Sequence, residues 1–338
     1  MAQSKEREHF VIIGSNCFSG ACFIDYLLKD NPAAIVTAVS RSAEYADFFL
    51  PYKKTAPERV HFHQLNLNDD TERIFSIVRE AEADYIVNFA AQGMVAESWS
   101  NPGQWFQTNC ISLMKLADRL TAERVPLKRF VQVSSPEVYG ASAGEAEDKA
   151  HYRPSTPYAA SKAAGDLSLY PYYLHKGFPV VYTRATNVYG PYQQPYRIIP
   201  RTALFIKAGL KVQLHGGGRA VKSYMHIDDV CDATLQIARN GRNGEVYHIS
   251  PDGQGISIHD LVEKICARMG RQMEGCVEMV AERFGQDAAY VINSDKVRQE
   301  FGWRPRVGLD EGLDGVIAWV EAYHAELMKM PRQYVHKA

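Results

Sequence analysis

The chain has 338 residues, with 38 Lys and Arg against 39 Asp and Glu, so its formal net charge is −1. This balance argues against nucleic acid as a partner, because binding to a phosphate backbone needs a concentrated excess of basic residues. The composition, 46% hydrophobic and 23% charged, is that of an ordinary globular protein with a sizeable core.

The first half of the chain alternates short β-branched runs with stretches of helical periodicity, the pattern of parallel strands joined by crossover helices. Strands are predicted at 10–13, 35–40, 60–65, 85–89, 129–134 and 180–183. Helices are predicted at 21–29, 70–80, 105–124 and 157–175, with Pro171 expected to kink or break the last one. This series predicts an α/β fold with a doubly wound parallel (Rossmann) sheet, which binds its ligand at the carboxyl ends of the strands.

After Gly190 the chain becomes richer in loops, with three prolines before residue 201 and three consecutive glycines at 216–218. We expect a smaller C-terminal α/β lobe for the substrate, with an amphipathic stretch at 258–269 and a packing helix within 309–328. Strands near 221–226 and 245–249 are expected to return to the main sheet. The predicted division is therefore interleaved: a nucleotide-binding domain at 1–186, with returning segments near 221–249, and a nucleotide-sugar-binding lobe at 187–338.

No apolar run approaches the roughly 20 residues of a membrane-spanning helix, so we expect a cytoplasmic protein without a membrane partner. The six cysteines form no CxxC pair, which favours reduced, buried thiols. No metal site is predicted. His61 and His63 would share one face of a strand, but further close ligands are lacking.

A glycine-containing turn, residues 14–20 (GSNCFSG), follows the first strand and opens a helix. Gly14 allows a tight turn, Gly20 allows close packing of helix and strand, and the helix N-terminus would face a pyrophosphate. The middle position, usually glycine, is Cys17. We expect a dinucleotide to contact this turn through Gly14, Asn16, Cys17, Phe18, Ser19 and Gly20.

In a dinucleotide-binding fold, residues at the end of the second strand contact the adenosine ribose of a nicotinamide cofactor. An acidic residue there favours a free 2′-hydroxyl, and an arginine favours a 2′-phosphate. This strand ends in Ser40, Arg41 and Ser42 without an acid, so NADP is expected, with NAD as the alternative. Asn66 and Leu67, after the third strand, are expected beside the adenine.

Two further segments suggest catalysis. Ser135 lies at the end of a predicted strand, and Tyr158 and Lys162 lie four residues apart at the start of a helix, so both can point at one substrate. An adjacent ammonium is expected to lower the pKa of the Tyr158 phenol from about 10 towards neutrality, which would make the phenolate a usable base.

With these motifs the chain resembles the extended short-chain dehydrogenase/reductases that act on nucleotide sugars, and within them the 4,6-dehydratases of dTDP-glucose and GDP-mannose. The resemblance rests on residues 88–92 (NFAAQ), 135–140 (SPEVYG), 154–162 (PSTPYAASK), 187–191 (NVYGP) and 301–305 (FGWRP). It implies that Ala90, Ala91, Gln92, Tyr158 and Lys162 also contact the cofactor. Together with the Ser-Arg-Ser segment, Ala90, Ala91 and Gln92 favour the GDP-mannose enzyme, which uses NADP.

The resemblance implies a tightly bound cofactor that is recycled within each turnover of an NDP-hexose to its 4-keto-6-deoxy product. Tyr158, with Lys162 and Ser135, would take the C4 hydroxyl proton while hydride leaves C4. Glu137 would take the C5 proton, water would leave C6, and hydride would return to C6. In the dTDP-glucose enzymes an aspartate precedes this glutamate, whereas this chain has Pro136, which can do no acid chemistry. Glu137 is therefore expected to carry its proton from C5 to the leaving oxygen.

Substrate contacts are also implied by the resemblance. Asn187 matches a diphosphate-binding residue, Arg197 lies where a basic side chain often helps, and Lys222 replaces the later phosphate-binding arginine as a point charge. The usual arginine pair is Ala288 and Ala289, for which Arg219 and Arg283 are candidate substitutes. The predicted set is Met94, Glu97, Ser135, Pro136, Asn187, Arg197, Arg219, Lys222 and Arg283.

Three other functions are compatible with the sequence. A 4-epimerase of the same fold needs no carboxylate at position 137, and an NDP-hexuronate decarboxylase keeps the glutamate. A non-catalytic NAD(P)-binding regulatory protein is the alternative outside the enzymes, and the four intact catalytic positions argue against it. The resemblance also implies a homodimer that pairs through the helices at 105–124 and 157–175.

Overall fold

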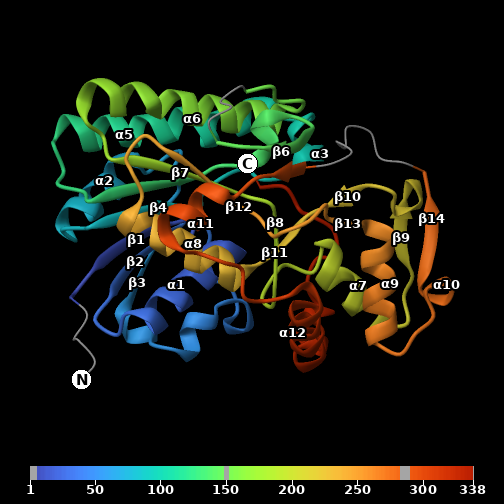
Figure 1. Ribbon diagram of the computed structural model, residues 1–338. Coiled ribbons are helices and arrows are strands. Elements are labelled where there is room, and N and C mark those ends of the chain that lie inside the picture. Colours follow the sequence, from blue (N-terminus) through green and yellow to red (C-terminus); the bar gives the residue numbers. More distant parts are fainter. Residues whose placement is uncertain (1–5, 148–151, 282–289, 338) are drawn as a thin grey trace.

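The main body is a seven-stranded parallel sheet with helices on both faces (Figure 1). The structure is a computed structural model that describes residues 6–147, 152–281 and 290–337. The strand order is β12-β7-β5-β4-β1-β2-β3, and it reverses between β1 and β4, so this is the predicted doubly wound fold. The strands are β1 (His9–Ile13), β2 (Ile35–Ser40), β3 (Val60–Gln64), β4 (Tyr85–Asn88), β5 (Arg129–Val133), β7 (Val180–Ala185) and β12 (Val246–Ile249).

Each face of the sheet buries its own apolar cluster. One cluster joins the sheet to α1 (Phe18–Asp30), α8 (Ile227–Asn240) and α11 (Asp295–Phe301). The other joins it to α2 (Thr71–Glu80), α5 (Leu113–Ala122) and α6 (Pro157–Lys176). α5 follows α4 (Pro102–Phe106) through a π-helical turn at Gln107–Ser112, so the helix expected at 105–124 starts earlier and is irregular.

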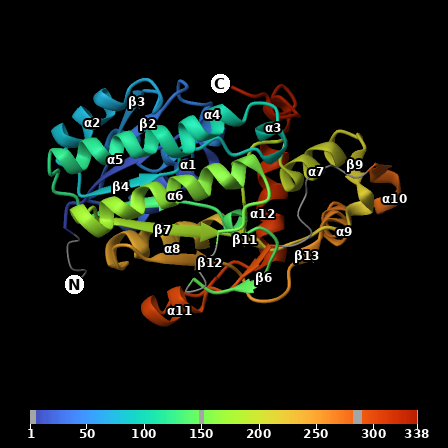
Figure 2. The ribbon, with the colours of Figure 1, turned by 90° about the horizontal axis from the view of Figure 1, so that it is seen from above.

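Helix α6 begins and ends at residues suited to those places. Thr156 caps its N-terminus by accepting a hydrogen bond from the Ala159 N–H at 3.1 Å, and Pro157 fixes the first turn. Gly177 ends it with φ of +67°. A kink or a break was predicted at Pro171, and the break is wrong, because α6 continues through this residue (Figure 2). Pro171 is exposed, so water can satisfy the carbonyl that loses its helical partner.

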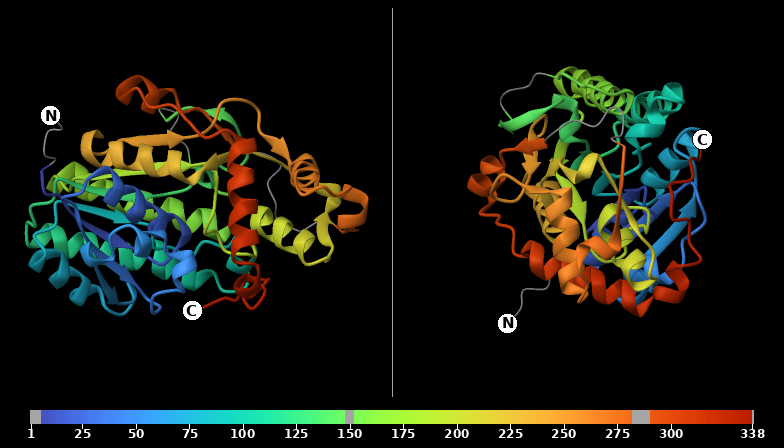
Figure 3. Two further views of the ribbon diagram at one scale, coloured as in Figure 1. Left: turned by 90° about the horizontal axis from the view of Figure 1, so that it is seen from below. Right: turned by 90° about the vertical axis from the view of Figure 1, so that its right-hand side faces the viewer.

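The smaller lobe lies beyond the carboxyl ends of the strands and has its own core, in which α12 packs against α7 and α9. The red α12 stands between this lobe and the main sheet in the left view of Figure 3, where Trp319 Nε1 donates to the Phe48 carbonyl at 3.1 Å. The lobe contains α7 (Ile198–Lys207), β9 (Val212–His215), β13 (Ile256–Ser257), α9 (Ile258–Arg268), α10 (Met273–Cys276), β14 (Val277–Val280), α12 (Leu309–Ala322) and α13 (His324–Leu327). Two further strands, β6 (Ser142–Glu145) and β15 (Tyr290–Ile292), pair with each other.

Only one of the two expected returning segments joins the main sheet. β12 pairs in parallel with β7, as expected. The expectation for 221–226 was wrong: β10 (Val221–Lys222) pairs with β13, and β11 (Tyr224–His226) pairs with β8 (Asn187–Tyr189). These strands are too short to extend the sheet, and they link the substrate-side lobe to the start of α8.

Candidate functional site

A cavity of about 740 Å³ opens at the carboxyl ends of β1, β2, β4 and β5, where it faces the smaller lobe. This is the position at which a doubly wound sheet binds its ligand. The cavity collects most of the predicted cofactor residues: Gly14, Asn16, Cys17, Phe18, Ser19, Ser40, Arg41, Ser42, Asn66, Leu67, Ala90, Ala91, Gln92 and Tyr158. Gly20 and Lys162 lie behind the lining.

The turn after β1 has the form that a pyrophosphate-binding turn requires. Gly14 has φ of +88°, and a Cβ there would lie 2.6 Å from the Ala90 nitrogen. A Cβ on Gly20 would lie 2.5 Å from the Gly14 carbonyl oxygen, so both positions need glycine. Cys17 caps α1, with Sγ accepting from the Gly20 N–H at 3.2 Å. Burial raises the pKa of its thiol to about 11, so no thiolate opposes an anionic ligand.

The turn is tied to the loop after β2. The Asn16 amide donates to the carbonyls of Ser42 at 2.9 Å and Ala43 at 2.8 Å. These bonds fix the position of the loop that carries Arg41, which lines the same cavity. The glycine cradle, the N-terminus of α1 and this cation together fit a dinucleotide.

The π-helical turn before α5 holds the loop after β4. Asn109 accepts from the Gln92 N–H at 2.9 Å, and its amide donates to the Gln92 carbonyl at 3.0 Å and to Ser161 Oγ at 2.9 Å. The bulge thus connects the predicted cofactor residue Gln92 to helix α6. Such irregular turns are frequent at functional sites.

Ser135, Glu137 and Tyr158 face one another in the cavity. Glu137 lies on the 3₁₀ turn Pro136–Tyr139 after β5, where its N–H donates to Ser135 Oγ at 3.2 Å. Burial and the nearby Glu137 carboxylate raise the pKa of the Tyr158 phenol, while a hydrogen bond with Ser135 and the charge of Arg197 lower it. The three side chains therefore act on one another electrostatically.

Lys162 lies one helical turn from Tyr158 and is 3% exposed. Its Nζ donates to the Val133 carbonyl at 2.7 Å, and burial lowers the pKa of its ammonium to about 8. The expectation that Lys162 lowers the pKa of Tyr158 was wrong for this structure. Desolvation of the phenol and the Glu137 charge outweigh any cationic help.

A buried ion pair lies behind Lys162. The Arg184 guanidinium and the Asp166 carboxylate meet at 2.8 Å, with both side chains 1% exposed. Asp166 also accepts from Ser134 Oγ at 2.6 Å. Asp166 raises the pKa of Lys162 and Arg184 lowers it, so the pair is electrostatically coupled to the lysine.

The substrate-side predictions are only partly brought together. Met94, Pro136, Asn187, Arg197 and Lys222 line the cavity. The other two described candidates do not: Glu97 lies outside the lining, and Arg219 donates to its own turn at the Gly216 carbonyl, 3.2 Å away. Arg283 lies outside the described residues. Lining residues that sequence reasoning missed include Tyr45, Gln193, Tyr196, Arg201 and Tyr334, none of which belongs to a recognised motif.

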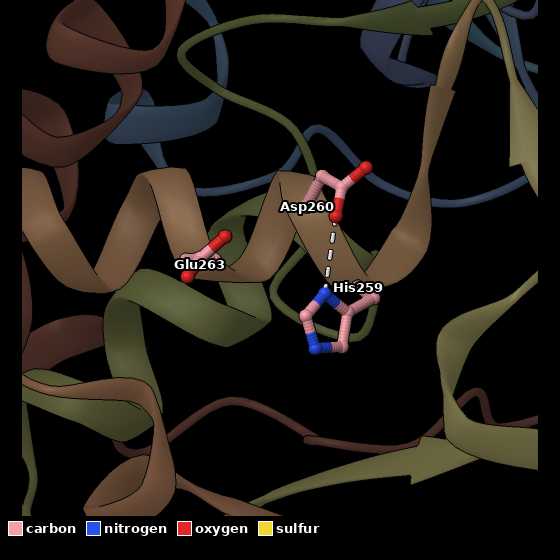
Figure 4. Close-up of side chains that lie close together, drawn as sticks. All are labelled: His259, Asp260 and Glu263. Atoms are coloured by element: carbon pink, nitrogen blue, oxygen red, sulfur yellow. Dashed lines mark hydrogen bonds and ion pairs between the residues drawn. The ribbon is translucent and has the colours of Figure 1, made fainter.

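Among the described residues, one group of potential metal ligands comes together outside this cavity. His259, Asp260 and Glu263 on α9 have ligand atoms within 4.8 Å of one another (Figure 4). His259 Nδ1 lies 3.1 Å from Asp260 Oδ1, and both carboxylates are exposed. Exposed side chains of this kind fix no coordination geometry, so we assign the group no role.

Comparison with known proteins identifies relatives along the whole chain. The family model described as GDP-mannose 4,6 dehydratase matches residues 11–316. The dTDP-glucose 4,6-dehydratase of Streptomyces griseus is 32% identical over 319 residues, covering 94% of each chain. That of Streptomyces niveus is 36% identical over 251 residues, covering 73% of this chain and 74% of the relative.

Solved structures agree with this result. The dTDP-glucose 4,6-dehydratase of Streptomyces venezuelae, with NAD bound, superposes with a TM-score of 0.84 at 29% identity, covering 94% of this chain and 98% of that one. The Bacillus anthracis enzyme in complex with NAD gives 0.83 at 27% identity, covering 93% and 97%. These NAD-bound structures support a nicotinamide cofactor for the fold seen here. No helix in the described part of the chain is long and apolar enough to cross a membrane.

Proposed function

The chain belongs to the GDP-mannose 4,6-dehydratase family, and we propose that Ser135, Glu137, Tyr158 and Lys162 carry out its reaction on a nucleoside-diphosphate hexose. The observation that carries this proposal is the placement of Ser135, Glu137 and Tyr158 in one cavity with the dinucleotide turn. A base for C4 and a carboxylate for C5 are thus available beside the same sugar. A 4-epimerase would have no use for the second group.

Tyr158 takes the proton of the C4 hydroxyl, and Ser135 holds the same oxygen through its hydroxyl group. A bound nicotinamide cofactor would supply the hydride acceptor at C4 and the hydride donor at C6 within one turnover, and its positive ring would favour the phenolate. Lys162 keeps a positive charge below pH about 8, which opposes the raising of the Tyr158 pKa by burial and Glu137 without overcoming it. Asp166 helps to keep this charge on Lys162.

Glu137 takes the C5 proton, which the C4 ketone has made acidic, and passes it to the C6 oxygen as water leaves. When hydride is returned to C6, C5 takes a replacement proton that comes from solvent. Pro136 supports this single-residue role, because the position before the glutamate holds no acid. The short 3₁₀ turn at Pro136–Tyr139 fixes the backbone that carries the Glu137 carboxylate.

We propose NADP as the cofactor, with NAD as the alternative. Arg41 lines the cavity at the end of β2, in a loop without an acid, and the Asn16 bonds hold that loop in place. A guanidinium there favours a 2′-phosphate. The substrate diphosphate is assigned to Asn187, Arg197 and Lys222, on the side of the cavity formed by the lobe at 187–338. The six free cysteines support a reducing, cytoplasmic setting.

We also propose a homodimer that pairs through α5 and α6. Leu167, Tyr170 and Leu174, three to four residues apart on α6, are 52%, 46% and 57% exposed, and Ile111 before α5 is 38% exposed. Large apolar side chains repeated along one helix face fit an isologous interface. Leu174→Asp is expected to shift the sedimentation coefficient to that of a monomer, while the wild type sediments as a dimer. A monomeric wild type contradicts the proposal.

The test of catalysis compares Glu137→Gln with Tyr158→Phe. Glu137→Gln is expected to lower the dehydration rate by about 10²–10⁴-fold and to leave an oxidised sugar, short of two hydrogens, in amounts comparable with the enzyme. Tyr158→Phe is expected to block both products. Rapid quench and mass spectrometry of the sugar nucleotide separate these outcomes. Full dehydration by Glu137→Gln refutes the assignment.

A further inference from the structure

The last described residues, 331–337, run without helix or strand from the smaller lobe to the neighbourhood of α4 (Figure 2). They follow α13, and Met330 before them packs against the core of the smaller lobe. Seven extended residues can reach about 23 Å, enough to cross a dinucleotide groove. We call this segment the strap.

The far end of the strap is attached to the nucleotide-binding body. The His336 imidazole stacks on the Trp105 indole of α4, with ring centroids 5.0 Å apart and planes 15° apart. His336 Nε2 also lies 2.5 Å from Gln104 Oε1. The Gln92 amide donates to the Lys337 carbonyl at 2.9 Å. One attachment therefore uses Gln92, a residue of the loop that we assign to the cofactor.

The middle of the strap lines the cavity. Tyr334 is among the lining residues, and its ring meets that of Tyr196 at 5.6 Å, edge to face. Burial raises the pKa of its phenol, whereas the charges of Arg41 and Arg197 lower it. Tyr334 is thus close to the cation assigned to the cofactor ribose and to the cation assigned to the substrate diphosphate.

From these contacts we propose that the strap closes over the bound nicotinamide cofactor and retains it, with Tyr334 as a binding residue and His336 as the anchor. This inference rests on the proposed function, because it requires a cofactor in the groove. A recycled cofactor must outlast many substrate exchanges, and a segment that spans both lobes slows its release. Arg41 and Arg197 line the same cavity as Tyr334, and their charges favour anionic ligands in that space.

The test measures the release of reduced cofactor from the full chain and from a form that ends at Met330. Fluorescence after mixing with an excess of oxidised cofactor gives the dissociation rate, and rapid desalting gives the fraction retained. Tyr334→Ala and His336→Ala keep the strap but remove its contact residue or its anchor. Val335→Ala is the matched control, because its side chain is 60% exposed. Circular dichroism checks that each variant is folded.

We expect the truncated form and Tyr334→Ala to release cofactor about tenfold faster, with His336→Ala intermediate and Val335→Ala within about twofold of wild type. Trypsin provides an independent readout: saturation with cofactor is expected to slow cleavage after Arg332. Cofactor release at the wild-type rate from the truncated form overturns the proposal. Faster and tighter binding of cofactor to the truncated form also overturns it, because the strap would then obstruct the groove. A full-length chain that binds no cofactor contradicts the proposed function itself, and the strap proposal fails with it.

Discussion

The buried charge of Lys162 is expected to lower the free energy of unfolding. The variant Lys162→Met measures by how much. The lowering of its pKa from 10.5 to about 8 corresponds to a penalty of about 3 kcal/mol for an ammonium buried in the folded chain. Both folded and unfolded lysine are protonated below pH 8, so the full penalty applies there. As the pH rises from 8 to 10.5 the folded lysine loses its proton first, and the penalty disappears.

Lys162→Met removes this penalty but leaves the Val133 carbonyl without its donor, which costs about 1–2 kcal/mol. At about pH 6.5 the variant should therefore be more stable than wild type by about 1–2 kcal/mol, although inactive. At about pH 9.5 the penalty has fallen to about 1.4 kcal/mol, so the difference between variant and wild type should drop by about 2 kcal/mol.

The assay is urea unfolding of the cofactor-free proteins at both pH values. At each pH the variant is compared with wild type, so the titration of all other groups cancels from the difference in unfolding free energy. Lys115→Met, which replaces an exposed lysine on α5, is the control and should show no such pH dependence. A stability difference for Lys162→Met that stays constant or grows between the two pH values refutes the reasoning.

Two further substitutions, each paired with a control elsewhere in the chain, test how the site is supported. Gly14→Ala should cost at least about 2 kcal/mol of unfolding free energy and abolish cofactor binding, because φ is +88° and the new Cβ meets backbone; urea unfolding and cofactor titration check this. Gly103→Ala, with no atom within 4 Å, is its control. Asp166→Asn should cost about 3–5 kcal/mol in urea, because Arg184 keeps a buried charge without its partner. Glu72→Gln, which breaks the exposed pair with Arg119, is the control for this loss and should leave the unfolding free energy nearly unchanged in the same assay.

The cofactor turn and the succession of sheet strands along the chain could be predicted, because both depend on local sequence. A strand that ends in Gly14 and a helix that begins near Gly20 specify the turn from adjacent residues alone. The spacing of Tyr158 and Lys162 similarly requires only a helix. These signals do not depend on how distant segments meet.

The features that sequence reasoning missed depend on distant contacts. Tyr334 lines the cavity in a segment whose end is fixed by distant contacts, among them the stack of His336 on Trp105, more than two hundred residues earlier. The raised pKa of Tyr158 comes from burial and from Glu137, which motif spacing does not report. The short strands at 221–226 pair within the smaller lobe, because their hydrogen-bond partners come from segments whose position the sequence does not specify.

The central claim is that this site dehydrates a nucleotide sugar by way of proton transfer at C5. The most direct measurement incubates the protein in deuterated water with GDP-, UDP-, CDP- and dTDP-hexoses and analyses the products by mass spectrometry. We expect one of these nucleotide hexoses to lose one water and to gain one non-exchangeable deuterium at C5. A product of unchanged composition from the hexoses, or loss of carbon dioxide from a hexuronate, would contradict this claim.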